Sequence, residues 1–211
     1  LLAVGLPLDF APPGDAETGA QLAQRAVAAG AYVAAAHPFW YSLSEADVLS
    51  LGDIHAIETY NGTSVDYNDK PESWYMLDLM LHRGHRYNAC ATDDAHFQPG
   101  RADALLAWVQ VKAEELSPES ILEALKNGYY YSSTGPEIYD IDIIPGDKVT
   151  VRCSPASRVF VVGTLAHAVS VYGNGLREVT LRINRFDSPW GRIIVRDENG
   201  GRAWSNPFWF V

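Results

Sequence analysis

The chain of 211 residues has little cysteine, no cluster of positive charge and no long apolar run. Its two cysteines, Cys90 and Cys153, are too few for a scaffold held by disulfides. The formal net charge is −10, which argues against a nucleic-acid surface because phosphate binding relies on clustered Lys and Arg. No apolar stretch approaches the ~20 residues that a membrane span needs. We therefore expect neither nucleic acid nor a membrane as a partner.

Three signatures of catalysis are also missing from the sequence. It has no Gly-rich phosphate loop, no Gly-x-Ser-x-Gly elbow and no Cys/His pair at a plausible catalytic spacing. Covalent catalysis by a side-chain nucleophile therefore lacks support. The sequence does not indicate a cellular compartment.

Residues 1 to 136 alternate short apolar runs with helical patterns. Strands are predicted at 1–8, 31–36, 54–60, 86–92 and 104–111. Helices are predicted at 16–29, 44–51, 73–83 and 117–128. This rhythm is typical of βα units, so we expect an α/β fold with a parallel sheet or barrel.

The pattern changes near Gly135 and Pro136, where helical periodicity ends. Short alternating runs follow at 139–144, 148–153, 159–163, 168–172, 178–183, 191–195 and 208–211. Turn residues separate these runs, which is typical of a β-sandwich. We therefore expect two domains, one over 1–136 and a small antiparallel β-sandwich over 137–211.

Polar side chains capable of binding a metal follow three successive predicted strands. Because ligands collect at the carboxyl ends of parallel strands, we expect these side chains to converge. One carboxylate and two imidazoles among them are ligand types that hold Zn²⁺, Mn²⁺ or Fe²⁺. The group is His37, Glu58, Asn61, Asp93, Asp94 and His96.

The adjacent carboxylates of Asp93 and Asp94 allow two interpretations. They repel each other, and burying them is unfavourable without a counter-charge, which a metal ion would supply. The alternative is a solvated Asp-Asp turn in which His96 hydrogen-bonds a carboxylate. The residues alone favour neither the metal site nor the solvated turn.

Several motifs in order along the chain resemble the PHP (polymerase and histidinol phosphatase) superfamily. Ala36-His37-Pro38 is similar to its His-Pro motif, and Asp94-Ala95-His96 is similar to its closing Asp-x-His motif. Residues 57–62 are similar to the strand between them. Residues 93–97, 124–128, 131–136 and 201–207 resemble a subgroup related to carbaryl hydrolases.

The resemblance implies a distorted (β/α)₇ barrel, with residues 1–136 as its C-terminal part, followed by the β-sandwich. It also implies a site with two or three divalent metal ions, Zn, Mn or Fe. The family's opening His-x-His and several further ligands have no counterpart, since His37 is the first histidine of the chain. The expectation is therefore a chain truncated at its N-terminus, with its first strands missing, that holds one ion at most. A degenerate homologue is the alternative.

By the same resemblance, the expected function is metal-dependent hydrolysis of a small-molecule ester, most simply a phosphoester, by a metal-activated water. The implied metal ligands are His37, Asp94 and His96. The implied catalytic set is Asp94, His96, Glu58 and Asn61. Asp93 and Glu58 would orient ligands or waters, and Asn61 would donate to a substrate oxygen. The candidates for the pocket rim are Trp40, Tyr41 and Arg101.

Two other functions stay open. The same site would serve hydrolysis of a carbamate or carboxylic ester, because attack by a metal-bound hydroxide suits all of these bonds. Alternatively, the protein is an inactive PHP-like chain whose β-domain serves binding or structure. Aromatic residues of that domain would then form an exposed face, whereas in an enzyme we expect them to be its buried contact with the first domain. They are Trp190, Trp204, Phe208, Trp209 and Phe210.

Overall fold

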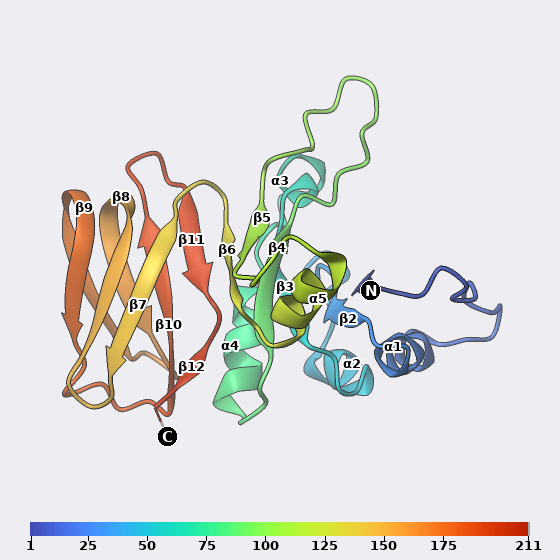
Figure 1. Cartoon of the computed structure of the whole chain (residues 1–211), viewed down its shortest axis with the longest axis horizontal. Helices are drawn as coiled ribbons and strands as arrows, with labels where there is room; N and C mark the ends of the chain where they lie inside the picture. The colour runs from blue at the N-terminus through green and yellow to red at the C-terminus, as the bar shows by residue number, and fades with distance from the viewer. Residues whose placement is uncertain (211) are drawn as a thin grey trace.

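The structure is a computed structural model and describes residues 1–210 (Figure 1). Its helices are α1 (Gly19–Ala28), α2 (Glu45–Ser50), α3 (Thr63–Tyr67), α4 (Trp74–His82) and α5 (Pro118–Lys126). Its first strands are β1 (Leu2–Val4), β2 (Tyr32–Ala35), β3 (Ala56–Asn61), β4 (Asn88–Thr92), β5 (Trp108–Val111) and β6 (Tyr130–Ser133). The others are β7 (Ile138–Ile144), β8 (Lys148–Val162), β9 (Ala168–Arg182), β10 (Trp190–Arg196), β11 (Arg202–Ser205) and β12 (Phe208–Trp209). None of these helices is long and apolar enough to cross a membrane.

The predicted fold class, an α/β part of a distorted (β/α)₇ barrel followed by a small β-sandwich, is wrong. The structure is mixed and largely β, with 19% helix and 37% strand. One sheet has four strands in the order β1-β2-β3-β4. The other is antiparallel, and its path β5-β6-β11-β10-β8-β7 curls into a half-barrel, with β9 beside β8 and β12 beside β10. We call these the first and the second sheet.

The barrel prediction failed because strand order along the chain does not fix strand direction. Within residues 1–210, only β2, β3 and β4 pair in parallel, with α2 in the first connection and α3 and α4 in the second. β1 runs antiparallel to β2, and β5 runs antiparallel to β6 although α5 lies between them. A parallel pair needs a long crossover, but a long connection with a helix also allows an antiparallel return.

The second sheet crosses the predicted domain boundary at residue 136. β6 pairs with β11, with Ser133 opposite Ala203 and Ser132 opposite Trp204. The strands β5 and β6, which precede residue 136, therefore extend the sheet formed by the later strands. The division at 136 itself stays a prediction.

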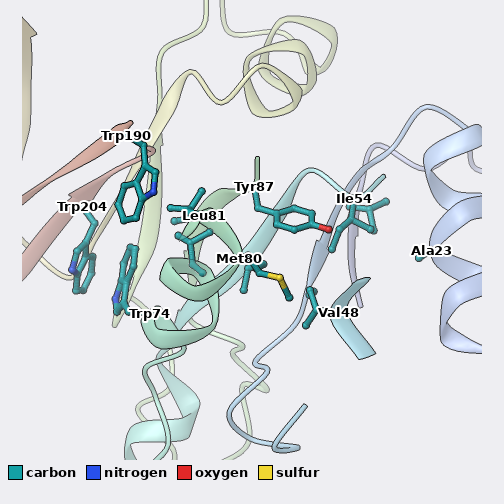
Figure 2. Close-up of a cluster of buried hydrophobic side chains, with 14 of the residues drawn as sticks. Ala23, Val48, Ile54, Trp74, Met80, Leu81, Tyr87, Trp190 and Trp204 are labelled. Atoms are coloured by element: carbon teal, nitrogen blue, oxygen red, sulfur yellow. The ribbon is translucent and has the colours of Figure 1, made fainter. Parts of the chain in front are cut away.

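Helix α4 joins the two sheets through a buried aromatic cluster (Figure 2). Trp190 of β10 and Trp204 of β11 are almost completely buried. The ring centroids of Trp74 and Trp204 are 5.2 Å apart, and Leu81 of α4 belongs to the same cluster. For Trp190 and Trp204, the structure thus confirms a buried contact with the preceding part of the chain, not an exposed face.

An ion pair lies in the same contact. Arg192 of β10 is 5% exposed and forms two hydrogen bonds to the carboxylate of Asp78 on α4, at 3.0 and 2.8 Å. Its guanidinium carbon also lies 4.4 Å from the Trp74 ring centroid. The paired geometry offsets the cost of burying the guanidinium.

Asn206, just after β11, ties the second sheet to the edge of the first. Its Oδ1 accepts a hydrogen bond from the backbone N–H of Ala89 on β4, at 2.8 Å. Its Nδ2 donates to the carbonyls of Gly128 and Tyr130, at 2.9 and 3.0 Å. The Oγ of Ser132 donates to the carbonyl of Ala89 at 3.3 Å, so side chains satisfy both backbone groups of Ala89.

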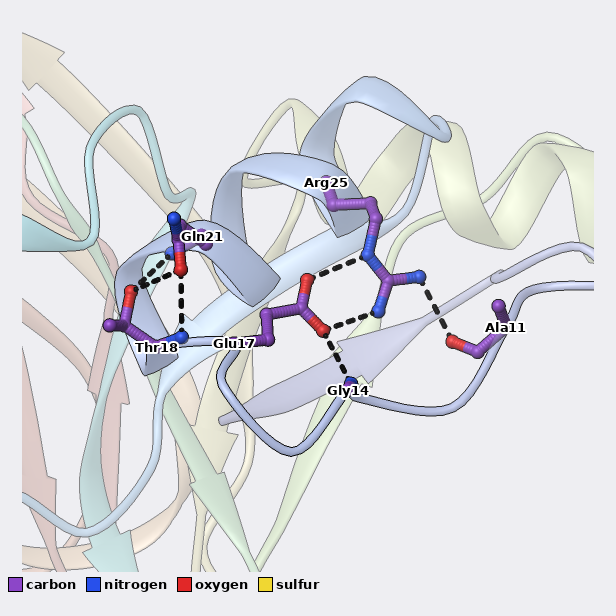
Figure 3. Close-up of polar contacts among 6 residues, drawn as sticks. All are labelled: Ala11, Gly14, Glu17, Thr18, Gln21 and Arg25. Carbon is purple, nitrogen blue, oxygen red and sulfur yellow. Dashed lines mark hydrogen bonds and ion pairs between the residues drawn. The ribbon is translucent and has the colours of Figure 1, made fainter.

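The segment between β1 and α1 is held by polar contacts (Figure 3). Arg25 of α1 pairs with Glu17 at 2.8 Å and donates from Nη1 to the carbonyl of Ala11 at 2.9 Å. Thr18 and Gln21 form a reciprocal capping box that starts the helix. This loop therefore has a defined path across the end of α1.

Candidate functional site

The carboxyl ends of β2, β3 and β4 bring several of the predicted site residues together. These strands pair in parallel, so their ends lie at one edge of the first sheet. Glu58 and Asn61 belong to β3, His37 lies two residues beyond β2, and Asp94 lies two residues beyond β4. Hydrogen bonds join these four residues, His37 through its backbone N–H and the other three through their side chains.

Glu58 is the centre of this group and is only 2% exposed. Its Oε2 accepts from the backbone N–H of His37 and from Asn61 Nδ2, the latter at 3.3 Å. Its Oε1 accepts from the hydroxyl of Thr92 at the end of β4. Burial raises the pKa of the Glu58 carboxyl, and these three donors oppose that shift only in part. One buried carboxylate thus links the ends of three strands.

Asn61 places its amide between two carboxylates. Its Nδ2 donates to Glu58 Oε2 at 3.3 Å and to Asp94 Oδ2 at 3.2 Å. Its Oδ1 accepts from both the backbone N–H and the hydroxyl of Ser64, each at 3.0 Å, which fixes the amide orientation. Two carboxylates therefore share one neutral donor, an arrangement that favours a nearby cation.

The backbone at this edge is strained at two of the predicted ligands. Asp94 has φ of 52° and His37 has φ of 28°, values that are uncommon for residues other than glycine. The hydroxyl of Thr63 donates to the carbonyl of Asp94 at 2.9 Å and holds that conformation. At Gly62 an added Cβ would lie 2.8 Å from the Leu106 side chain, so the close approach here requires glycine.

Aromatic residues surround the His37 ring. Its centroid lies 5.5 Å from that of Trp40 and 5.3 Å from that of Tyr41. Trp40 stacks on Tyr67 at 4.9 Å, and the guanidinium carbon of Arg101 lies 5.4 Å from the Tyr67 centroid. Nδ1 of His37 is buried and has no hydrogen-bond partner within residues 1–210. Trp40 and Tyr41 therefore lie beside His37, and Arg101 lies near Tyr67, which stacks on Trp40.

Asp93 and His96 lie differently from Asp94. The Asp93 carboxylate accepts from three consecutive backbone N–H groups, those of Leu105, Leu106 and Ala107, at 2.6 to 2.8 Å. It closes the long loop that projects beside α3 in Figure 1. His96 is exposed, and its backbone N–H donates to Asp103 at 2.8 Å, which lowers the pKa of that carboxyl.

The described residues do not complete a metal site. Within residues 1–210, no group of three or more His, Cys, Asp and Glu side chains is placed to hold a metal ion. The unpaired Nδ1 of His37 and the Asp94 carboxylate offer two donors of suitable chemistry, and His96 is not grouped with them. A catalytic zinc needs three protein ligands, so the fit to a metal is partial.

A cavity of about 260 Å³ adjoins the same edge. Gly62 and Thr63 on its wall directly follow Asn61, and Arg101 brings a positive charge to it. The acidic side chains on the wall are Asp66 and Asp103. Tyr67 also lines the cavity, so the aromatic cluster around His37 continues into it.

Three further residues belong to this site and were not predicted from the sequence, namely Thr92, Ser64 and Tyr67. The contact of Ser64 had a signal in the sequence, because an Asn side chain at the start of a helix often accepts from the backbone N–H three residues later, as Asn61 does. Thr92 directly precedes the Asp-Asp pair at the end of a predicted strand. Tyr67 had none, since only the structure shows that α3 returns to Trp40.

Neither a protein-family model, nor a curated protein, nor a solved structure matches this chain.

Proposed function

We propose that this chain is a metal-dependent hydrolase of small-molecule esters, with site chemistry like that of the PHP superfamily. The observation that carries the proposal is the Asn61 amide held between the Glu58 and Asp94 carboxylates. The backbone N–H of His37 also donates to Glu58, and the Nδ1 atom of His37 is buried without a partner in residues 1–210. A cation stabilises two neighbouring carboxylates, of which Glu58 is buried and Asp94 is partly exposed. The motifs around His37 and Asp94 give independent support.

In this proposal His37 and Asp94 would hold a divalent ion. His96, which is exposed and not grouped with them in the structure, would be the third ligand only after its side chain turns towards them. Glu58 positions His37 through its backbone N–H, and Asn61 positions the Asp94 carboxylate. An ion held there would supply a water of lowered pKa and a positive charge for the ester oxygen. We expect one ion at most on these residues.

Arg101 favours a phosphoester among the possible substrates. Arg101 lines the cavity together with Asp66 and Asp103, and its guanidinium carbon lies 5.4 Å from the Tyr67 centroid. Arginine pairs well with phosphate oxygens, whereas a neutral carbamate or carboxylic ester has no charge to match it. The cavity is small, so we expect it to accept the phosphate end of a substrate and not a large alcohol group.

The test compares 4-nitrophenyl phosphate with 4-nitrophenyl acetate, using protein stripped with a chelator and then supplied with Mn²⁺ or Zn²⁺. We expect hydrolysis of the phosphate that needs the metal and falls by about 100-fold or more in Asp94→Asn. Asp142→Asn on β7, exposed and far from this edge, is the matched control and should keep full activity.

Three results would count against the proposal. Hydrolysis that survives the chelator would exclude a metal-dependent reaction, and unchanged turnover in Asp94→Asn would remove Asp94 from the site. A folded protein that binds no metal and hydrolyses neither ester would favour the inactive alternative. Metal analysis checks the ligand set, since two or three tightly bound ions per chain would contradict our limit of one.

A further inference from the structure

Three arginines lie side by side across three strands of the second sheet. Arg196 of β10 is directly opposite Arg158 of β8 on one side and Arg202 of β11 on the other. We call this set the arginine row. Side chains at directly opposite positions are about 5 Å apart at Cβ, and like charges placed there destabilise a sheet. The row therefore needs a compensating interaction.

The row lies on the outer face of the half-barrel. The neighbouring residues Val159, Val195 and Ala203 point into the core of the second sheet, so the arginines point the other way. On that outer face, Ile194 and Trp204 belong to the cluster packed around α4. The arginine row is one step further along these strands and borders this contact.

Only one arginine of the row has an acidic partner in the described part of the chain. Arg202 pairs with Glu72 at 2.9 Å. Arg158 and Arg196 form no salt bridge within residues 1–210, and the Nε atom of each is buried without a hydrogen-bond partner there. This is unexpected in a chain with 26 acidic and 16 basic residues. Two neighbouring positive charges are therefore left uncompensated.

Aromatic rings lie near both guanidinium groups and pack closely against that of Arg158. The guanidinium carbon of Arg158 lies 3.5 Å from the Tyr172 centroid and 4.4 Å from that of Phe160. That of Arg196 lies 5.7 Å from the Phe160 centroid. Stacking occupies the face of a guanidinium and leaves N–H groups at its edge. Of the edge groups, Arg158 Nη2 donates to Ser170 Oγ at 3.3 Å.

We propose that Arg158 and Arg196 together bind one phosphate group of a small molecule. Two neighbouring guanidinium groups carry two positive charges, which match the charge of about −1.5 to −2 on a phosphate monoester at pH 7. Their edges supply charge-assisted hydrogen bonds to its oxygens. This site is separate from the strand-end site of the first sheet and does not depend on its chemistry.

The test is a titration with inorganic phosphate and with methyl phosphate, followed by calorimetry and thermal unfolding. Sodium chloride keeps the ionic strength constant, and a chelator keeps metal ions away. We expect saturable binding of both anions to the wild type. Arg158→Gln and Arg196→Gln should each weaken binding by about tenfold or more, and the double variant should not bind.

Three further variants make the result specific. Arg158→Lys keeps the charge but loses the planar guanidinium, so its affinity should fall between those of the wild type and Arg158→Gln. Arg177→Gln, an exposed change on β9 outside the row, should bind as the wild type does. Asp94→Asn should also bind normally, so failure of the proposed hydrolase activity would leave this result intact.

The variants should fold, because removing one of two facing positive charges relieves repulsion. We therefore expect Arg196→Gln to unfold, in the absence of phosphate, at a temperature no lower than the wild type. Any one of three outcomes would overturn the proposal. The wild type could bind neither anion saturably, the double variant could bind as fully as the wild type, or Asp94→Asn could lose binding.

Discussion

The two sheets of this protein gather polar side chains in different ways. In the first sheet β2 is buried along its whole length, so its polar groups appear only where the strand ends. In the second sheet β8 alternates buried and accessible residues, so charged side chains line one face. The carboxyl ends of parallel strands meet at one edge of a sheet. Antiparallel neighbours instead place side chains next to one another across one face of the sheet. Strand direction thus decides where each sheet can form a site.

The largest expected effect comes from breaking the contact between the sheets. Trp204→Ala removes a buried ring that packs against Trp74, and we expect a loss of about 3–5 kcal/mol in the free energy of unfolding. Urea unfolding measures it. If the sheets are otherwise independent, the single transition should separate into two.

The control for Trp204→Ala is Leu116→Ala, which truncates a side chain that is 96% exposed. It should change stability by no more than about 0.5 kcal/mol. A similarly small effect at Trp204 would mean that α4 does not join the sheets energetically.

A smaller effect is expected from the ion pair in the same contact. Asp78→Asn leaves the buried Arg192 guanidinium without its carboxylate, and we expect a cost of about 2 kcal/mol because Asp78 itself is partly exposed. Asp140→Asn breaks the exposed pair with Arg152 and should cost no more than about 0.5 kcal/mol. Equal costs in urea unfolding would show that burial does not distinguish the two pairs.

The pH dependence of the free energy of unfolding tests the site of the first sheet, because Glu58 is a buried ionisable group there. Because burial raises its pKa in the folded state, its contribution to stability is fully present below its unfolded pKa and is lost as pH rises through the folded value. Glu58→Gln cannot ionise. We therefore expect this variant to gain stability relative to the wild type as pH is raised from about 4.5, near the ordinary Glu pKa, towards 8.

Urea unfolding of both proteins at several pH values measures that difference. A difference that stays constant over this range, or that shrinks as pH rises, would contradict a raised pKa at Glu58. Glu137→Gln, at an exposed glutamate, is the control and should give nearly parallel curves.

The smallest effect is expected at α5, which lies between the two antiparallel strands β5 and β6. The Ser117 hydroxyl accepts from the backbone N–H of Ser120 at 3.2 Å and caps the helix. Ser117→Ala should cost about 1 kcal/mol in the free energy of unfolding. Ser117→Asp retains a capping oxygen and should restore most of it, whereas an equal loss in both variants would argue against the cap.

Many local elements were predictable from the sequence, but α3, β6 and the pairing of the strands were not. Ser44 and Ser117 start helices as predicted, because capping depends on neighbouring residues. The run from 168 to 183 was predicted as two strands because Gly173 and Gly175 indicate a turn. The structure has one strand there, β9, with an irregular register opposite Ala156, since glycine also permits a bulge.

The same limit applies to the sites. His37 and Asp94 were predicted to converge because each follows a strand of the parallel set, and strand ends can be found in a sequence. Their grouping with His96 was not found in the described residues. The arginine row had no sequence signal, because Arg158 and Arg196 become neighbours only through a register that the chain order does not reveal.

The Asn206 contact has a consequence for self-association. An uncovered strand edge is a template for another chain, and on β4 both backbone groups of Ala89 are already occupied by side chains. At the opposite margin, β1 pairs only with β2 among residues 1–210. Recruitment of a donor strand, whether from a neighbouring molecule or from an added peptide, is therefore expected at Leu2–Val4 and not at Asn88–Thr92.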